Sequence, residues 1–108
     1  MRRFAFMATV FLMAGAFSFA ETWTGRLVDA ACKAKYEGSD SPAANCAATR
    51  ETHLFGIELA DARVLDLDAA GNEKADDAIK RVQKKDLHAT VTGVLRGQMV
   101  KVVAIQVQ

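Results

Sequence analysis

Two cysteines, Cys32 and Cys46, are the side chains of this sequence best suited to do chemistry. Three kinds of chemistry fit such a pair: a structural disulfide, a redox-active dithiol, or half of a zinc site. A redox-active pair usually has C-x-x-C spacing, which is absent, and a zinc site would need both His53 and His88 as further ligands. An even number of cysteines in an oxidising compartment predicts a disulfide. The compartment to which the chain is sent therefore decides between the three kinds of chemistry.

The N-terminal segment indicates that destination. Arg2 and Arg3 precede an apolar stretch over residues 4–17, and Ser18-Phe19-Ala20 places small residues before Glu21. This pattern predicts a secretory signal peptide over residues 1–20. A spanning helix needs ~20 apolar residues, so we expect cleavage rather than an uncleaved anchor, and no stable membrane insertion afterwards. We therefore predict a secreted, periplasmic protein with a Cys32–Cys46 disulfide.

The predicted mature chain, residues 21–108, has the length of one domain. The whole sequence has 14 Lys+Arg and 13 Asp+Glu, and two of the arginines, Arg2 and Arg3, leave with the signal peptide. The mature chain therefore has 12 basic and 13 acidic residues, a net charge of −1. A near-neutral chain without a basic cluster argues against nucleic acid as a partner, because phosphate binding needs several cationic contacts.

Five strands are predicted, three from their content of β-branched and aromatic residues, and the second and third from alternating apolar and polar residues. The strands are expected at residues 22–29, 53–60, 63–68, 87–95 and 99–107. Between the first two strands, Asp29 and Ser41 are suited to cap helical turns over residues 30–36 and 42–48. The two cysteines would tie these turns together.

A longer helix is expected after Asn72, a good N-cap residue. Apolar residues at i, i+3, i+4 and i+7 form one stripe along it: Ala75, Ala78, Ile79 and Val82. The segment that begins at Asp66 partly matches a calcium-binding loop, but Ala70 stands at a ligand position. The end of a strand followed by a helix cap is therefore the preferred interpretation.

Five strands with one helix between the third and the fourth is the order of the oligonucleotide/oligosaccharide-binding fold, the OB-fold. We therefore expect a mainly β, five-stranded OB-like barrel. Its helix would close one end of the barrel, and the cysteine-containing segment would connect the first strand to the second.

Two stretches of the chain carry a resemblance to known families. Trp23-x-Gly25-x-Leu27-x-Asp29-x-x-Cys32, with a second cysteine ahead of an apolar strand, resembles small secreted bacterial domains of unknown function. The ending, Val91-Thr92-Gly93-Val94 with Val100-Lys101-Val102 and Ile105, is similar to that of the bacterial periplasmic OB-fold family. The resemblance implies a binding or stress-associated protein of the cell envelope and supplies no catalytic residues.

We expect a non-catalytic binding protein and not an enzyme, because neither G-x-S-x-G nor H-E-x-x-H occurs. Its partner would be a protein, small-molecule or glycan ligand, with no cofactor and no metal. The expected binding surface combines aromatic and cationic residues of the first strand and the cysteine segment: Trp23, Arg26, Lys33, Lys35 and Tyr36.

A structural or interaction module is the leading alternative. The last strand, residues 99–107, is nearly all β-forming, and a long apolar edge is a template for pairing with another chain. The protein would then self-assemble through this strand, and a charge at Val102 would separate the copies. Metal or haem binding by His53 or His88 is a third alternative, and the oligomeric state stays open.

Overall fold

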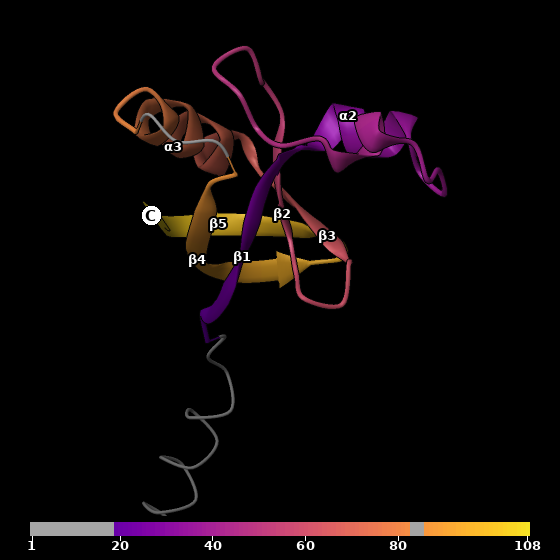
Figure 1. Cartoon of the computed structure of the whole chain (residues 1–108). Coiled ribbons are helices and arrows are strands. Elements are labelled where there is room, and N and C mark those ends of the chain that lie inside the picture. Colours follow the sequence, from indigo (N-terminus) through magenta and orange to yellow (C-terminus); the bar gives the residue numbers. More distant parts are fainter. Residues whose placement is uncertain (1–18, 83–85) are drawn as a thin grey trace, which may run out of the picture.

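The five strands in the described part of the chain close into a barrel. The computed structural model describes residues 19–82 and 86–108 (Figure 1). Its strands are β1 (Glu21–Asp29), β2 (Phe55–Glu58), β3 (Val64–Leu67), β4 (His88–Arg96) and β5 (Met99–Val107). The helical elements are α2 (Ala30–Lys35), the 3₁₀ helix η1 (Pro42–Asn45) and α3 (Ala69–Ile79). The expected mainly β barrel, with one helix between β3 and β4, is confirmed.

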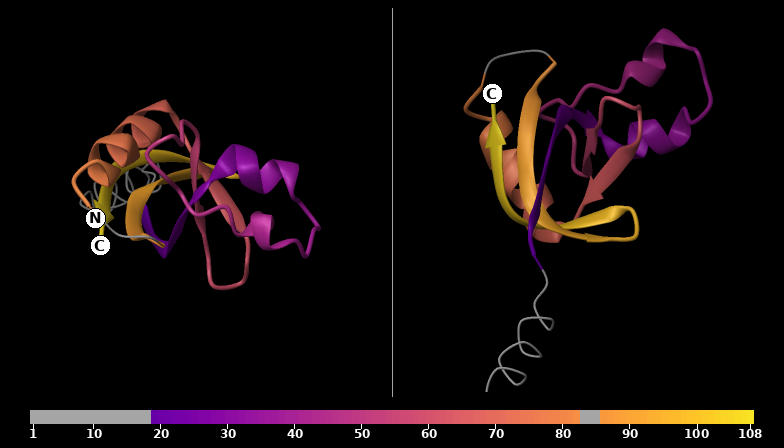
Figure 2. Two further views of the ribbon diagram at one scale, coloured as in Figure 1. Left: turned by 45° about the horizontal axis from the view of Figure 1, so that its top comes forward. Right: turned by 90° about the horizontal axis from the view of Figure 1, so that it is seen from below.

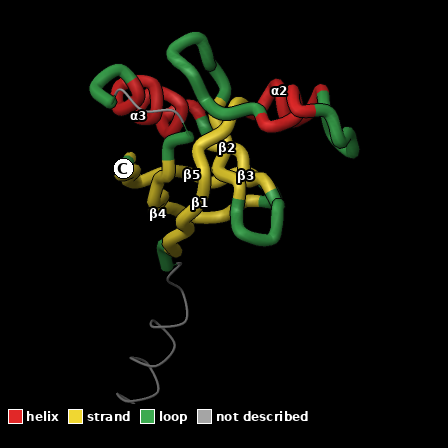
Figure 3. Tube along the Cα trace, in the orientation of Figure 1, coloured by secondary structure: helices red, strands yellow, loops and turns green. Residues whose placement is uncertain are grey.

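The order of strands around the barrel is β1-β2-β3-β5-β4, and β4 returns to β1. β1 has two antiparallel partners: β4 as far as Arg26, and β2 from Arg26 to Asp29. β3 and β5 run parallel and pair over only two residues each, as far as Leu67 and Val100. This short parallel contact completes the barrel. Strands fill the centre of the molecule, and the helices lie outside them (Figure 3).

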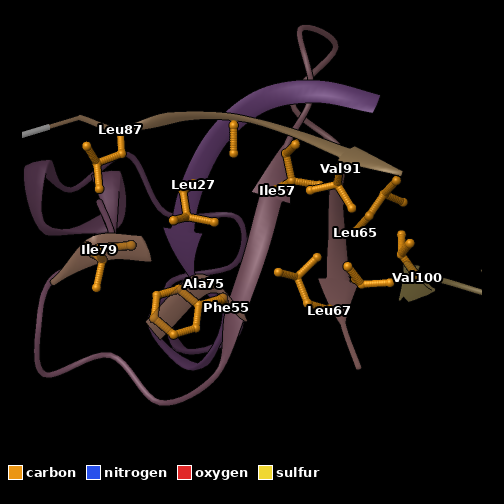
Figure 4. Packing of buried hydrophobic residues seen from close by; sticks show 13 residues of the cluster. Leu27, Phe55, Ile57, Leu65, Leu67, Ala75, Ile79, Leu87, Val91 and Val100 are labelled. Atoms are coloured by element: carbon orange, nitrogen blue, oxygen red, sulfur yellow. The ribbon is translucent and has the colours of Figure 1, made fainter. Parts of the chain in front are cut away.

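One hydrophobic core fills the barrel (Figure 4). Phe55 and Ile57 come from β2, Leu27 from β1, Val91 from β4 and Val100 from β5, and each is almost fully buried. Alternation along each strand places these side chains inside, because successive residues of a strand point to opposite faces. α3 contributes Ala75 and Ile79, so the expected apolar stripe of the helix does pack against the core.

The start of α3 differs from the sequence-based expectation. Its N-cap is Asp68, whose Oδ1 accepts a hydrogen bond from the Gly71 N–H at 2.9 Å. The Asn72 N-cap prediction was therefore wrong: Asn72 lies within the helix, and its Oδ1 accepts from the Phe55 N–H at 2.8 Å. The helix can start before Asn72 because residue 71 is a glycine. Gly71 lies so close to β5 that a Cβ there would collide with Val102.

Several strand boundaries also differ from the expected ones. β2 begins at Phe55 and ends at Glu58, two residues inside the expected span at each end. A turn begins directly afterwards, since the Leu59 N–H donates to the Arg63 carbonyl at 2.8 Å and Ala62 has φ 72°. β3 stops at Leu67 because Asp68 is needed as the helix cap. The bounds of β5 agree with the prediction.

β5 contains a bulge that decides which of its valines are exposed. The pairing with β4 shifts between Thr92 and Gly93, so that Val103 has no partner in the register. Val102 is buried (7 % exposed), whereas Val103 is 63 % exposed. A charge at Val102 would therefore disrupt the core, and Val103 is the residue at which to test self-assembly through this strand.

The predicted signal peptide falls mainly on residues 1–18, which lie outside the described residues. β1 begins at Glu21, directly after the expected cleavage point. Among the described residues, the helices are too short to cross a membrane.

Candidate functional site

The first part of the connection between β1 and β2 stands away from the barrel, and we call it the disulfide lobe, residues 30–46. It contains α2 and η1 (Figure 2). Neither helix contributes a buried side chain. The expected disulfide is confirmed: Cys32 and Cys46 are bonded, with their Cα atoms 5.6 Å apart. The crosslink joins the first turn of α2 to the residue that follows η1.

Capping residues define both helices of the lobe, as expected from the sequence. The Asp29 Oδ1 accepts from the Cys32 N–H at 2.9 Å, and the Ser41 hydroxyl accepts from the Ala43 N–H at 3.2 Å. Cys46 is in the left-handed region with φ 53°, which turns the chain back toward the barrel. The N–H of Asp29 then donates to the Cys46 carbonyl at 2.8 Å, so the lobe is anchored where it meets β1.

A second anchor lies just beyond the lobe. Thr52 is buried, and its hydroxyl donates to the Asp29 Oδ2 at 3.0 Å. The Ala30 N–H donates to the Leu54 carbonyl at 2.8 Å. Asp29 therefore caps α2 with one carboxylate oxygen and fixes the returning chain with the other.

Three charged residues join the lobe to the barrel, and we call them the ion cluster: Arg26 of β1, Lys33 of α2 and Glu58 of β2. Glu58 Oε1 lies 2.9 Å from the Arg26 Nη2, and its Oε2 lies 2.7 Å from the Lys33 Nζ. The Arg26 Nη2 also donates to the Asn45 carbonyl at 2.6 Å. These side chains are only 17 to 21 % exposed, so the ion pairs are partly shielded from water.

The environment of Glu58 favours its charged form. Burial raises the pKa of Glu58, but hydrogen bonds and charge from Lys33 and Arg26 together outweigh that effect and hold the pKa below its usual 4.5. The carboxylate is therefore ionised at neutral pH and bridges two cations, one from the barrel and one from the lobe.

The structure brings some of the expected binding residues together and leaves one apart. Arg26 and Lys33 meet at Glu58, so both are engaged within the protein. Lys35 ends the same short helix and Tyr36 is its C-cap, with the Lys35 Nζ 5.4 Å from the centre of the Tyr36 ring. Trp23 is half-buried and packs against the core. It precedes Asp29 by six residues of strand, about 20 Å, and so lies far from α2 along β1.

The histidines and the aspartate-rich segment show no metal-binding geometry. His53 and His88 are both exposed. Within residues 19–82 and 86–108, no three His, Cys, Asp or Glu side chains gather in a way that could hold a metal ion. Asp68, which lies in the segment that partly matches a calcium-binding loop, accepts a hydrogen bond as the helix cap.

Sequence reasoning missed Glu58 and Asn45 as partners of the ion cluster. Glu58 looked like an ordinary outward residue of the second strand. A usable signal was present, because Glu58 is the one acidic side chain in the apolar run His53–Ala60. What it pairs with depends on the β1–β2 register, where Arg26 lies directly opposite it.

Comparison with family models, with curated proteins and with solved structures finds no match for this chain. The class of protein is therefore defined by its own geometry: a closed five-stranded β-barrel with a disulfide-crosslinked lobe between β1 and β2.

Proposed function

We infer that this chain is a non-catalytic binding protein of the bacterial cell envelope, exported to the periplasm, whose ligand docks on the disulfide lobe. The observation that supports this most is the combination of rigidity and exposure. The lobe is held by a crosslink, two helix caps and the ion cluster, yet its helices bury no side chain. Such restraints contribute little to the packing of the core, but they reduce the conformational entropy that a surface loses when it binds a ligand.

The fold supports the same interpretation. The closed strand order, the parallel β3–β5 pair and the helix before β4 agree with an OB-like barrel. In that fold, the connection between the first two strands often contributes to ligand binding, and here this connection contains the lobe. The disulfide itself agrees with an oxidising compartment such as the periplasm.

Tyr36 and Lys35 are the residues of the lobe best suited to contact a ligand. Tyr36 is half-buried and Lys35 is exposed, and the two adjacent side chains lie close together at the end of α2, with the Lys35 Nζ 5.4 Å from the centre of the Tyr36 ring. Tyrosine provides a rigid apolar surface with one polar end, and lysine provides a positive charge. Arg26 and Lys33, by contrast, are held by Glu58, so replacing either one would disturb the fold as well as binding.

The test is a ligand search by nuclear magnetic resonance with isotopically labelled residues 21–108. Protein, glycan and small-molecule fractions of a bacterial envelope extract would be added separately. We expect one fraction to shift the amide signals of residues 30–46, and Tyr36→Ala to abolish the shifts without changing the unfolding temperature. Lys101→Ala, an exposed position on β5, is the matched control. Shifts that map elsewhere, or that survive Tyr36→Ala, would refute a ligand site on the lobe.

A further inference from the structure

A second surface lies away from the disulfide lobe, on the side of the barrel where α3 packs against β5 (Figures 1 and 2). It is a groove with a volume of about 330 Å³. One wall is formed by Lys74, Asp77, Ala78 and Arg81, and the other by Val103, Ala104 and Ile105. Three consecutive apolar residues of β5 thus line the groove together with charged residues of α3 and of the turn that follows it.

The strand wall of this groove has an unpaired backbone edge. Hydrogen-bonded and non-hydrogen-bonded residue pairs alternate along an antiparallel ladder. The Gln108 N–H donates to the His88 carbonyl at 2.8 Å, so the next hydrogen-bonded pair of β4 and β5 is Thr90 with Gln106. Ile105 belongs to a non-hydrogen-bonded pair, so its N–H and C=O point away from β4. On that side β3 pairs only as far as Val100. Within the described residues, no other strand pairs with β5 beyond this point.

This edge lacks the usual protection against strand addition. Exposed edges generally carry charges or proline, whereas Val103, Ala104 and Ile105 are all apolar. The groove extends from Lys74 along α3 and past its end to Arg81, about 10 Å, which is the length of roughly three residues of extended chain. α3 stands beside the edge and obstructs the approach of another sheet, so a single extended segment fits best.

The charges on the helix wall indicate what that segment carries. Lys74 and Arg81 flank Asp77, which leaves a net positive charge along the groove. Lys80, the C-cap of α3, pairs with Asp76 at 3.0 Å, but no ion pair among the described residues engages Lys74 or Arg81. A second copy of the chain would bring its own Lys74 and Arg81 to the contact, where like charges repel. An acidic peptide is the complementary partner.

We propose that the groove between α3 and β5 binds an extended acidic peptide segment of another protein, which adds a strand to β5 at Ile105. Backbone hydrogen bonds to Ile105 would hold the segment. Apolar contacts with Val103 and Ala104, and ion pairs with Lys74 and Arg81, would select it. This site shares no residue with the lobe, so its test does not depend on whether the lobe binds a ligand.

The test is a titration of labelled residues 21–108 with two blocked peptides, acetyl-Glu-Val-Thr-Val-Glu-amide and its Lys-Val-Thr-Val-Lys counterpart. We expect the acidic peptide to bind in the millimolar range, to shift the Ile105 amide signal and to slow its hydrogen exchange. It should bind at least about fivefold more tightly than the basic peptide at low salt, because the basic peptide would replace two exposed ion pairs with two contacts between like charges.

Variants connect the effect to the groove. The double variant Lys74→Glu/Arg81→Glu should reverse the preference between the two peptides, whereas Lys101→Glu, outside the groove, should preserve it. Tyr36→Ala should have no effect here, which separates this site from the lobe. Equal binding of both peptides by the wild type, or no shift at Ile105, would overturn the proposal. A dimer that Val103→Lys dissociates would instead assign the edge to a second copy.

Discussion

Glu58 links the barrel to the disulfide lobe through ion pairs. Its two carboxylate oxygens accept hydrogen bonds from cations of different elements, Arg26 in β1 and Lys33 in α2. Removing the negative charge would leave these cations facing each other in a partly buried place. The loss therefore includes their repulsion as well as the missing hydrogen bonds.

We expect Glu58→Gln to lower the free energy of unfolding by about 1–3 kcal/mol at neutral pH. It should also change the response to acid. The pKa of Glu58 is lowered on folding, so its stabilisation is present above its usual value of 4.5 and is lost as the pH falls through the lowered folded pKa. Unfolding temperatures of wild type and variant, measured from about pH 7 to pH 3, should therefore converge at the acid end.

Asp61→Asn is the control for this experiment. The backbone N–H and the side chain of Arg63 also lower the pKa of Asp61, but that ion pair is largely exposed. We expect a much smaller change in stability from this variant because solvent screens the pair. Curves of wild type and Glu58→Gln that stay parallel down to the lowest pH would show that the carboxylate of Glu58 does not stabilise the fold.

Gly71 shows how a close approach reverses the usual effect of glycine in a helix. Alanine at a free helical position is about 1 kcal/mol more stable than glycine. At position 71, however, the added Cβ would collide with Val102 and would lie 2.9 Å from the Leu67 Cβ. We expect Gly71→Ala to destabilise the protein by about 1–3 kcal/mol in denaturant unfolding.

A matched variant checks this interpretation of Gly71. Glu73→Gly, at an exposed position of α3, should cost about 1 kcal/mol through helix propensity alone. If Gly71→Ala proved neutral or stabilising, the helix would have room to shift away from β5. The groove beside it would then also be wider than described.

At the scale of elements, the disulfide lobe and the barrel are held by different forces. α2 has six residues, too few to be stable alone, and it buries no side chain. The barrel has its own core and does not use the lobe helices to fill it. The covalent bond between Cys32 and Cys46 should therefore matter most for the lobe.

We expect reduction and alkylation of the disulfide to lower the free energy of unfolding by about 3 kcal/mol on the chain-entropy estimate. Locally, the amides of residues 30–46 should lose protection in hydrogen exchange, while those of β4 and β5 stay protected. The double variant Cys32→Ser/Cys46→Ser should reproduce this pattern without alkylation. A lobe that stays protected after reduction would mean that the ion cluster alone suffices to hold it.

At the scale of the whole molecule, closure of the barrel depends on a short contact between β3 and β5. Asp68 reinforces it from the end of β3: its N–H donates to the Val100 carbonyl at 3.1 Å. Its Oδ1 accepts from both the Gly71 and the Val102 N–H groups. One side chain thus caps α3 and ties the helix and β3 to β5.

We expect Asp68→Ala to cost about 2–4 kcal/mol, because it removes a helix cap and also deprives the Val102 N–H of its acceptor. Ser41→Ala, which removes only the cap of the exposed η1, should cost about 1 kcal/mol or less. Asp68→Asn keeps an acceptor oxygen and should lie between them. Chemical unfolding of the three variants measures this order, and equal losses at Asp68 and Ser41 would contradict the role in closure.

Local patterns in the sequence were sufficient for much of the fold. β-forming composition, together with alternation in β2 and β3, identified all five strands, the helical stripe identified α3, and Asp29 and Ser41 were recognised as caps. Such patterns are readable because they depend on neighbours along the chain. The disulfide was also predictable, since two cysteines allow only one intrachain pair.

Tertiary structure decided what depends on residues far apart in the chain. Asn72 was mistaken for the N-cap because only the packing of Gly71 against Val102 shows that α3 starts earlier. Arg26 and Lys33 were expected to face a ligand, but the β1–β2 register places Glu58 between them. The bulge in β5 exposes Val103 and buries Val102, and nothing in the alternation of that strand reveals it. Composition and spacing thus determined the elements, whereas strand register determined which charges pair and which edge stays open, because register joins residues that the sequence separates.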